Sequence, residues 1–374
     1  DDRPVDRSSV SIKEVGDVYT GEGNKKLLPM RFVDYFVTIG PAVYELPRRA
    51  PSAPVKPPRL TGGSDLTEPE SKEPQLPPKP LPQLPPLPAK CEELGLLACL
   101  DGCFPPANTY QDALPDQCAP FIFPSGLQFS SEDKQPAIST FVLTDSNRVK
   151  VFGAALIFYE LLEPEEVAVL VTPREPAENY PELTSDPKYD YKKALAQRRQ
   201  EIKTNPGWHM VYVPKALALT GHYAFYTAFT EFLVDIYRTS LSSAPVPIER
   251  FINQFVVETP LPPLGRIEVC VALPSKTLSI SRPALNKLPM VDFSYRPLFA
   301  YLSVDHIITV LKMICGEFSI CFMSKKLALL TPVQEALLSF LFPLVWQGVY
   351  IPILPKHMME ILDAPVPIVT GIHS

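Results

Sequence analysis

A proline-rich stretch limits what one part of this chain can fold into. Of the 45 prolines in the chain, 14 lie between Pro47 and Pro88. Because proline has no backbone N–H, this stretch cannot supply the hydrogen bonds of a helix or a sheet, and we expect an extended, solvated segment with polyproline II character. Strand-like sequence lies on both sides, at Phe32–Ile39 and again beyond Cys91–Gln117, a segment without clear periodicity. We therefore interpret residues 47–117 as a proline-rich insert within one domain.

The composition excludes several classes of protein. Hydrophobic residues make up 46% and charged residues 20% of the 374 residues, which suits roughly two or three domains with buried cores. The net charge of −6 argues against a nucleic-acid binder. The seven cysteines are odd in number and scattered, which indicates a reducing compartment. No transmembrane segment is expected, because the most apolar stretch, Leu327–Leu354, is interrupted by proline and polar residues.

Residues 30–260 show the pattern of a sheet covered by helices, after a polar segment, residues 1–29, that we expect to be disordered. The predicted strand Val149–Leu162 is apolar on both faces, which is typical of a central strand. A polar insert, residues 164–206, contains a predicted basic helix, interpreted as solvated rather than lipid-bound. The predicted elements are the strands Ser139–Thr144, Val149–Leu162 and Trp208–Leu219 and the amphipathic helices Phe225–Ile236 and Ile248–Val256.

Residues 261–374 predict a second α/β lobe, because strands and helices alternate along them. A central helix is expected to begin with Thr331 as the cap, Pro332 in the first helical position and Gln334 in a capping box. No covering element follows the last strand, so the lobe is expected to be truncated. The other predicted elements are Ile267–Leu273, Thr277–Ser281, Val304–Ile314, Phe318–Met323, Tyr350–Leu354, Lys356–Leu362 and Val366–Ile372.

Short motifs along both halves resemble, in their order and spacing, those of DENN modules. The upstream motifs are Phe123–Leu127, Phe141–Asp145, Gly153–Glu160, Pro247–Ile252 and Leu261–Gly265. The downstream motifs are Ser281–Pro283, Leu288–Pro289, Leu330–Val333, Leu341–Pro343, Trp346–Pro355, Ala364–Pro367 and Gly371–Ser374. The resemblance covers residues 32–45 and 123–374.

The resemblance implies an α/β fold, with a longin-like sheet and covering helices followed by a partial α/β central DENN lobe. It also implies a guanine nucleotide exchange factor for a Rab-type small GTPase, which binds the switch regions and promotes GDP release in membrane trafficking. We expect a cytoplasmic protein without cofactor or covalent chemistry. Peripheral association with vesicle or endosomal membranes is left open. The helical third part of such modules has no counterpart here, so the activity of this chain by itself is also left open.

The chain lacks the spacings typical of enzyme active sites. It contains no G-x-S-x-G, no H-E-x-x-H and no G-x-x-x-x-G-K-[ST] motif. Cys91, Cys99, Cys103 and Cys118 lack the paired C-x₂-C knuckles of zinc sites, so we expect free thiols and no bound metal. An exchange factor needs only a surface that binds the nucleotide-free GTPase better than the loaded one.

The candidate GTPase-contact residues are polar residues at the predicted ends of strands. Binding groups are frequent on loops that a rigid scaffold positions. The alternative at each position is an ordinary turn residue. The candidates are Asp145, Ser146, Asn147, Glu317, Ser324 and Lys325.

Two overlapping motifs in the insert fit ligands of SH3 domains, K-x-x-P-x-x-P and P-x-x-P-x-K. The residues that carry them are Lys79, Pro82, Pro85, Pro88 and Lys90. A passive tether is the simpler interpretation. The motifs nevertheless support an alternative function, a non-catalytic scaffold or adaptor that binds partners through the longin-like lobe and SH3 proteins through the insert.

The SH3 hypothesis predicts that Pro82→Ala with Pro85→Ala weakens capture by an SH3 domain that binds the unchanged chain. The loss should be about tenfold or more, because both prolines of the first motif would lie in the ligand grooves. Pull-down with a panel of SH3 domains measures it. Pro69→Ala with Pro74→Ala, in the insert but outside both motifs, is the matched control. Capture that is equal for all three chains contradicts SH3 docking here.

Overall fold

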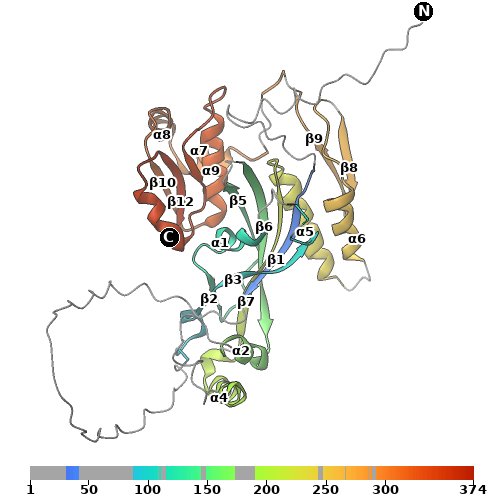
Figure 1. Ribbon diagram of the computed structural model, residues 1–374, viewed down its shortest axis with the longest axis vertical. Helices are drawn as coiled ribbons and strands as arrows, with labels where there is room; N and C mark the ends of the chain where they lie inside the picture. Colours follow the sequence, from blue (N-terminus) through green and yellow to red (C-terminus); the bar gives the residue numbers. More distant parts are fainter. Residues whose placement is uncertain are drawn as a thin grey trace, which may run out of the picture.

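The first half of the chain folds around a five-stranded antiparallel sheet (Figure 1). The computed structural model describes residues 31–41, 87–107, 109–110, 115–144, 149–172, 190–242, 247–265, 267–284, 286–288 and 292–374. In sheet order the strands are β3 (Ala98–Phe104), β1 (Tyr35–Pro41), β7 (Val211–Gly221), β6 (Lys150–Leu162) and β5 (Ala137–Thr144). The predicted early strand and the three later strands are thereby confirmed, with ends shifted by a few residues.

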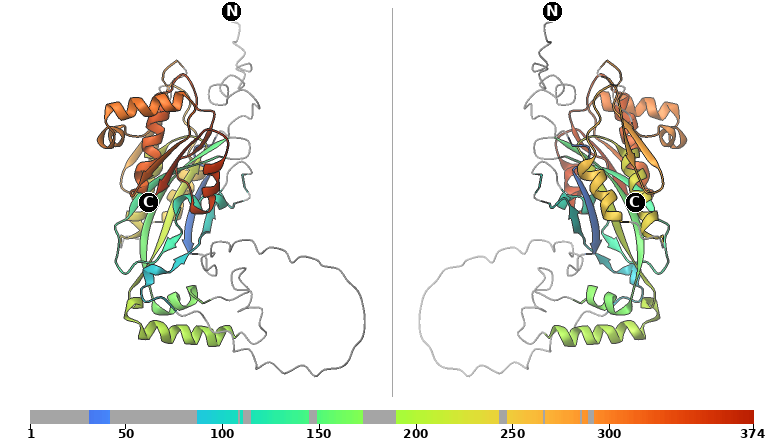
Figure 2. Two further views of the ribbon diagram at one scale, coloured as in Figure 1. Left: turned by 90° about the vertical axis from the view of Figure 1, so that its left-hand side faces the viewer. Right: turned by 90° about the vertical axis from the view of Figure 1, so that its right-hand side faces the viewer.

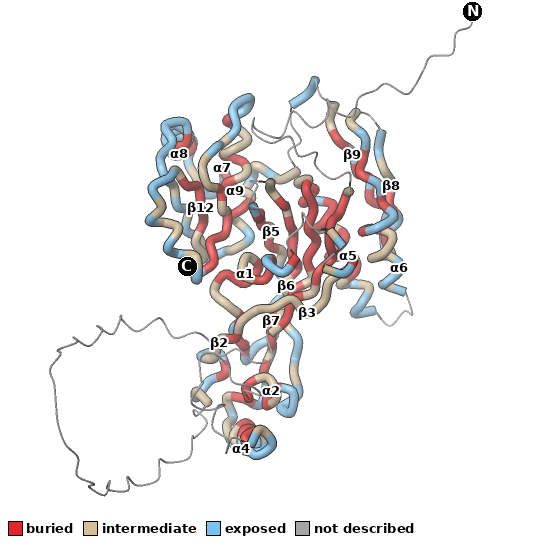
Figure 3. Tube along the Cα trace, in the orientation of Figure 1, coloured by how far each residue is buried: buried red, intermediate tan, exposed pale blue. Residues whose placement is uncertain are grey.

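Both faces of this sheet are covered by other parts of the chain. The two apolar faces of the predicted strand Val149–Leu162, which corresponds to β6, indicated this. Ala154 and Leu156 of β6 face one core, whereas Val151 and Ala155 face the other. The first core is closed by α5 (Tyr226–Ser240) and α6 (Ile248–Asn253). The second core contains α1 (Ala119–Ile122) and the buried thiols of Cys91 and Cys118. Figure 3 shows the central strands as almost continuously buried.

The hairpin of β8 (Glu268–Ala272) and β9 (Thr277–Ser281) packs into the first core beside α5. Val271, Leu278 and Ile280 share that core with Phe232 and Phe255, whose rings stack at 4.0 Å between centroids. The packing therefore continues past the boundary at residue 260 that the sequence suggested, and assigns the hairpin to the first half.

The prediction that Cys91–Gln117 forms an irregular loop is wrong. This segment contains β2 (Gly95–Leu96) and β3, and β3 forms the edge of the main sheet by pairing with β1. The composition of β3, with Asp101 and Gly102, has low strand propensity, so the pairing with β1 decides its conformation. The insert therefore does not extend to Gln117, because β3 already belongs to the main sheet.

The polar insert, residues 164–206, forms a helical pair at one end of the molecule. The pair consists of α2 (Pro164–Leu170) and α4 (Tyr191–Thr204), and it projects away from the second half of the chain (Figure 2). The predicted basic helix corresponds to α4, whereas residues 173–189 lie outside the described residues. Ile202 of α4 reaches the second core of the sheet, so this helix is anchored by an apolar contact.

The second half forms its own three-stranded parallel sheet, in the order β10–β12–β11. Its strands are β10 (Ile320–Ser324), β12 (Ile368–His373) and β11 (Val349–Ile351). The helices are α7 (Arg296–Tyr301), α8 (Val304–Cys315), α9 (Leu327–Ser339) and the 3-10 segment Lys356–Asp363. The predicted alternation of strands and helices is confirmed. No described helix has the length and hydropathy that a membrane crossing requires.

The predicted start of the central helix is wrong. Helix α9 begins at Leu327, and Pro332 lies inside it. The Thr331 hydroxyl donates to the Thr140 carbonyl of β5, and Gln334 Nε2 donates to the Leu330 and Pro352 carbonyls, so neither side chain caps the helix. Pro332 is the sixth residue of the helix, so its missing N–H removes one intrahelical hydrogen bond. Thr331 and Gln334 therefore form tertiary hydrogen bonds and do not cap the helix.

The close approach of Phe141 to Gly153 predicts a cost for any side chain at Gly153. A Cβ atom there would lie 2.2 Å from Phe141 Cζ, and Phe141 is fully buried. We expect Gly153→Ala to lower the free energy of unfolding by about 1–3 kcal/mol through overpacking. Gly40→Ala, in strand β1 with its nearest atoms at 3.8 Å, is the matched control and should cost less than about 1 kcal/mol. Urea unfolding measures both, and equal costs contradict the explanation.

Candidate functional site

The two halves meet along the β5 edge of the main sheet. Helix α9 and strand β11 lie against this edge, and Val142 of β5 packs with Tyr350 and Val369. Leu330 and Ile353 belong to the second core of the main sheet. The Lys356 backbone N–H also donates to the Pro124 carbonyl over 2.9 Å. The halves are therefore two lobes joined by a shared, largely apolar junction.

A polar cluster is enclosed in this junction. The Tyr350 hydroxyl donates a hydrogen bond of 2.8 Å to Glu335 Oε1 on α9. The Lys150 Nζ atom, at the start of β6, lies 5.0 Å from the centre of the Tyr350 ring. Tyr226 begins α5 and is 5% exposed, and its hydroxyl has no hydrogen-bond partner among the described residues. The cluster thus draws two residues from each lobe.

Burial governs the ionisation of this cluster. Burial raises the pKa of Glu335 above its usual value, and Lys150 and the hydrogen bond from Tyr350 offset part of the rise. Burial likewise raises the pKa of Tyr350 and of Tyr226, and the negative charge of Glu335 raises both further. A charged carboxylate without full hydration costs free energy unless donors or cations compensate it. Stability therefore depends on whether Glu335 carries a proton.

Helix α5 is capped across the junction. The backbone N–H of Thr227, the second residue of α5, donates to Asp292 Oδ2 over 2.9 Å. Asp292 belongs to the segment that leads into α7. A carboxylate at this position satisfies a free backbone donor and interacts favourably with the helix dipole. The second lobe thereby stabilises the start of a first-lobe helix.

A second buried polar group lies between the start of β1 and the end of β7. His222 Nδ1 and Asp34 Oδ2 are 2.6 Å apart, with side chains 0% and 1% exposed. Arg31 Nε pairs with Asp34 Oδ1 at 2.9 Å, and its guanidinium lies 3.8 Å from the centre of the Tyr110 ring. This compensated charge is a structural feature of the first lobe, because all of its members belong to that lobe.

The predicted GTPase-contact residues are only partly described. Asp145, Ser146 and Asn147 lie outside the described residues, although Thr144 and Lys150 on either side form the last residue pair of β5 and β6.

The junction cluster was not predicted from the sequence, because Glu335 counted there only as one of the polar residues that interrupt the apolar stretch Leu327–Leu354. An acidic residue within that apolar helix was the available signal.

The other three candidates lie at opposite ends of β10 (Ile320–Ser324). Ser324 and Lys325 are at its carboxyl end, where Ser324 Oγ accepts from the Lys326 N–H at 3.0 Å and His373 Nε2 lies 3.1 Å from the Lys325 carbonyl. Glu317 precedes the other end of the strand, is exposed and has a φ of 57°. The structure therefore separates Glu317 from Ser324 and Lys325.

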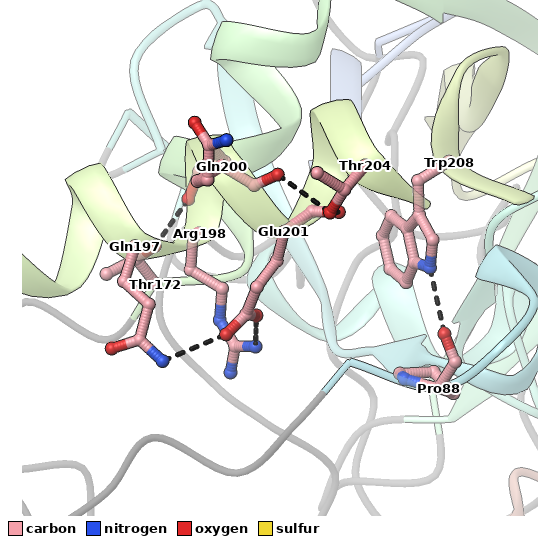
Figure 4. A network of polar contacts seen from close by, with 9 residues as sticks. Pro88, Thr172, Gln197, Arg198, Gln200, Glu201, Thr204 and Trp208 are labelled. Atoms are coloured by element: carbon pink, nitrogen blue, oxygen red, sulfur yellow. Dashed lines mark hydrogen bonds and ion pairs between the residues drawn. The ribbon is translucent and has the colours of Figure 1, made fainter. Parts of the chain in front are cut away.

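Of the SH3-ligand candidates, Lys79, Pro82 and Pro85 lie outside the described residues. The carbonyl of Pro88 accepts a 2.9 Å hydrogen bond from the Trp208 indole N–H, close to the polar contacts of α4 (Figure 4). Trp208 is fully buried, so Pro88 is tied to the first lobe, whereas Lys90 is exposed.

No cluster of three or more metal-binding side chains is found in the described part of the chain. All seven cysteines are free thiols. Burial raises the pKa of Cys103 to about 11, and it also raises the pKa of Cys118. Such thiols are protonated at neutral pH and are poor nucleophiles.

The raised pKa of Glu335 predicts a pH dependence of stability. Below the usual carboxyl pKa the proton is bound in both the folded and the unfolded chain, and the stability is fully present; it is lost as the pH rises through the raised pKa. Glu335→Gln should flatten this part of the curve. Urea unfolding between about pH 4 and about pH 8 measures it. Glu231→Gln, at an exposed pair with Lys276, is the control, and a Glu335→Gln curve parallel to that of the unchanged chain contradicts the assignment.

Comparison with known proteins gives matches to both lobes. Residues 100–158 match the uDENN domain family, and residues 212–374 match the DENN (AEX-3) domain family. The chain is 32% identical over 165 residues to the DENN domain and WD repeat-containing protein SCD1 of Arabidopsis thaliana. That alignment covers 44% of this chain and 14% of the relative, so the chain spans a small part of the relative's length. The chain thus carries a uDENN domain followed by a DENN domain.

Proposed function

We propose that this chain is part of a guanine nucleotide exchange factor for a Rab-type small GTPase. The observation that carries the proposal is the match to the uDENN and DENN families in a chain whose two lobes share one packed junction. The lobes bind the switch regions of the GTPase, and GDP leaves. The chain itself makes and breaks no covalent bond.

The physical basis of this activity is a coupling between two binding equilibria. A partner that binds the nucleotide-free GTPase more tightly than the loaded one must weaken nucleotide binding by the same factor. Such a partner gains from a surface that is already in its binding conformation, because little entropy is then lost on association. The apolar junction along β5 supports this requirement, since Leu330 and Ile353 of the second lobe enter the core of the first.

The proposed contact surface includes the segment between β5 and β6 and the carboxyl end of β10. The first holds Asp145, Ser146 and Asn147, and the second holds Ser324 and Lys325. Polar groups at strand ends can form hydrogen bonds with a partner while the strands keep them in place. Rab GTPases act on membranes, so we propose that the chain is cytoplasmic and acts at the surface of vesicle or endosomal membranes.

An adaptor function is the second candidate. The sequence observation that favours it is the K-x-x-P-x-x-P motif at Lys79–Pro85. The overlapping motif that ends at Lys90 is less suited to docking, because the Pro88 carbonyl is bonded to Trp208. An SH3 domain would therefore bind the first motif, and the lobes would bring other proteins to it.

The exchange function predicts that the full-length protein accelerates release of a fluorescent GDP analogue from at least one member of a Rab panel. Replacing Asp145, Ser146 and Asn147 together by alanine should slow this release by about tenfold or more, as truncation of interface hot spots does.

Lys276→Ala is the matched surface control, because Lys276 forms only an exposed pair with Glu231 on the β8–β9 turn. It should retain the full rate. Absence of acceleration for every Rab in the panel overturns the exchange function. Capture by SH3 domains with no exchange activity would favour the adaptor.

A further inference from the structure

The carboxylate of Glu335 lies where elements of both lobes converge. Its hydrogen-bond donor, Tyr350, is on β11, and the cation above the Tyr350 ring, Lys150, is on β6. Glu335 therefore connects the second-lobe helix α9 to the first-lobe sheet through Tyr350 and Lys150. Of the other ionisable groups on neighbouring elements, Tyr226 of α5 is affected by the charges of Glu335 and of Asp292, which caps α5.

Lys150 also marks one end of the segment that carries the candidate contact residues. It pairs with Thr144 in the β5–β6 ladder, and Asp145, Ser146 and Asn147 lie between the two in the sequence. The contact of Lys150 with the Tyr350 ring ties the start of β6 to the second lobe.

We propose that Glu335, Tyr350 and Lys150 form a protonation-sensitive latch that holds the two lobes together in the arrangement that binds the GTPase. The three are positioning residues, since they act through the lobe junction. The activity part of this inference rests on the proposed exchange function, whereas the latch itself is a property of the chain alone.

The direction of the protonation effect follows from burial. With the junction closed, Glu335 is half-buried between the lobes, and its pKa is raised, so it holds its proton more tightly than in water. By linkage, protonation must then favour the closed junction. When Glu335 is charged, the Tyr350 hydroxyl and Lys150 offset part of the cost of burying the carboxylate. Removing either partner should open the junction when Glu335 is charged and should matter less when Glu335 is neutral.

Hydrogen exchange tests the latch without any GTPase. Tyr350→Phe removes the donor but keeps the ring, and at about pH 8 it should speed amide exchange in α9 and β11 by about tenfold or more, because a hydrogen bond to a charged group is lost. Adding Glu335→Gln should restore protection, because no charge is then buried. Lowering the pH to about 5 should also restore it after correction for intrinsic exchange rates.

An internal control and a substitute variant make the test specific. The β8–β9 hairpin packs on the opposite core, so its amides should exchange equally in all variants. Lys150→Met alters a partly exposed side chain and replaces Tyr350→Phe if that variant does not fold. Unchanged protection in these variants, or protection that Glu335→Gln fails to restore, overturns the latch.

The GDP-release assay tests the activity part. Tyr350→Phe should slow release from a responsive Rab at about pH 8, and Glu335→Gln added to it should restore the rate. Slower release without a change in amide protection overturns the latch as its cause. If the unchanged protein accelerates release from no Rab, the exchange function fails, and the hydrogen-exchange pattern still decides the latch.

Discussion

The packing of α9 and β11 against the β5 edge is the interaction on which the architecture depends. An edge strand exposes unpaired backbone groups and an apolar flank, and covering it removes both from water. Here the cover comes from the second lobe, whose Leu330 and Ile353 enter the core of the first. The Thr331 hydroxyl adds a hydrogen bond to the Thr140 carbonyl. The two lobes are therefore stabilised by each other as well as by their own cores.

The same junction explains why a polar cluster persists within it. Tyr350 donates to Glu335, and Lys150 lies over the Tyr350 ring, so the carboxylate charge is compensated from two sides. Buried charges need such partners, because removal of one partner leaves an uncompensated charge, which lowers the free energy of unfolding. The Asp34–His222–Arg31 group satisfies the same requirement within the first lobe. Polar burial in this chain is thus concentrated where elements distant in sequence meet.

Periodicity predicted most helices and strands because their apolar faces are recorded locally. Strand β6 shows two apolar faces, and α5 shows a stripe at helical spacing, so both could be recognised without knowledge of their neighbours. Strand β3 and the start of α9 could not. The conformation of β3 comes from its pairing with β1, and Thr331 and Gln334 make tertiary hydrogen bonds instead of capping α9.

The sequence by itself determined the α/β class, the two-lobed order of elements and the likeness to DENN modules, because these depend on the order of local patterns along the chain. It also identified the polar residues at the strand ends as candidates for contact. Only the tertiary structure brought Glu335, Tyr350, Lys150 and Tyr226 together and separated Glu317 from Ser324. The reason is that burial and charge compensation depend on which surfaces meet, and residues far apart in sequence carry no local record of that meeting.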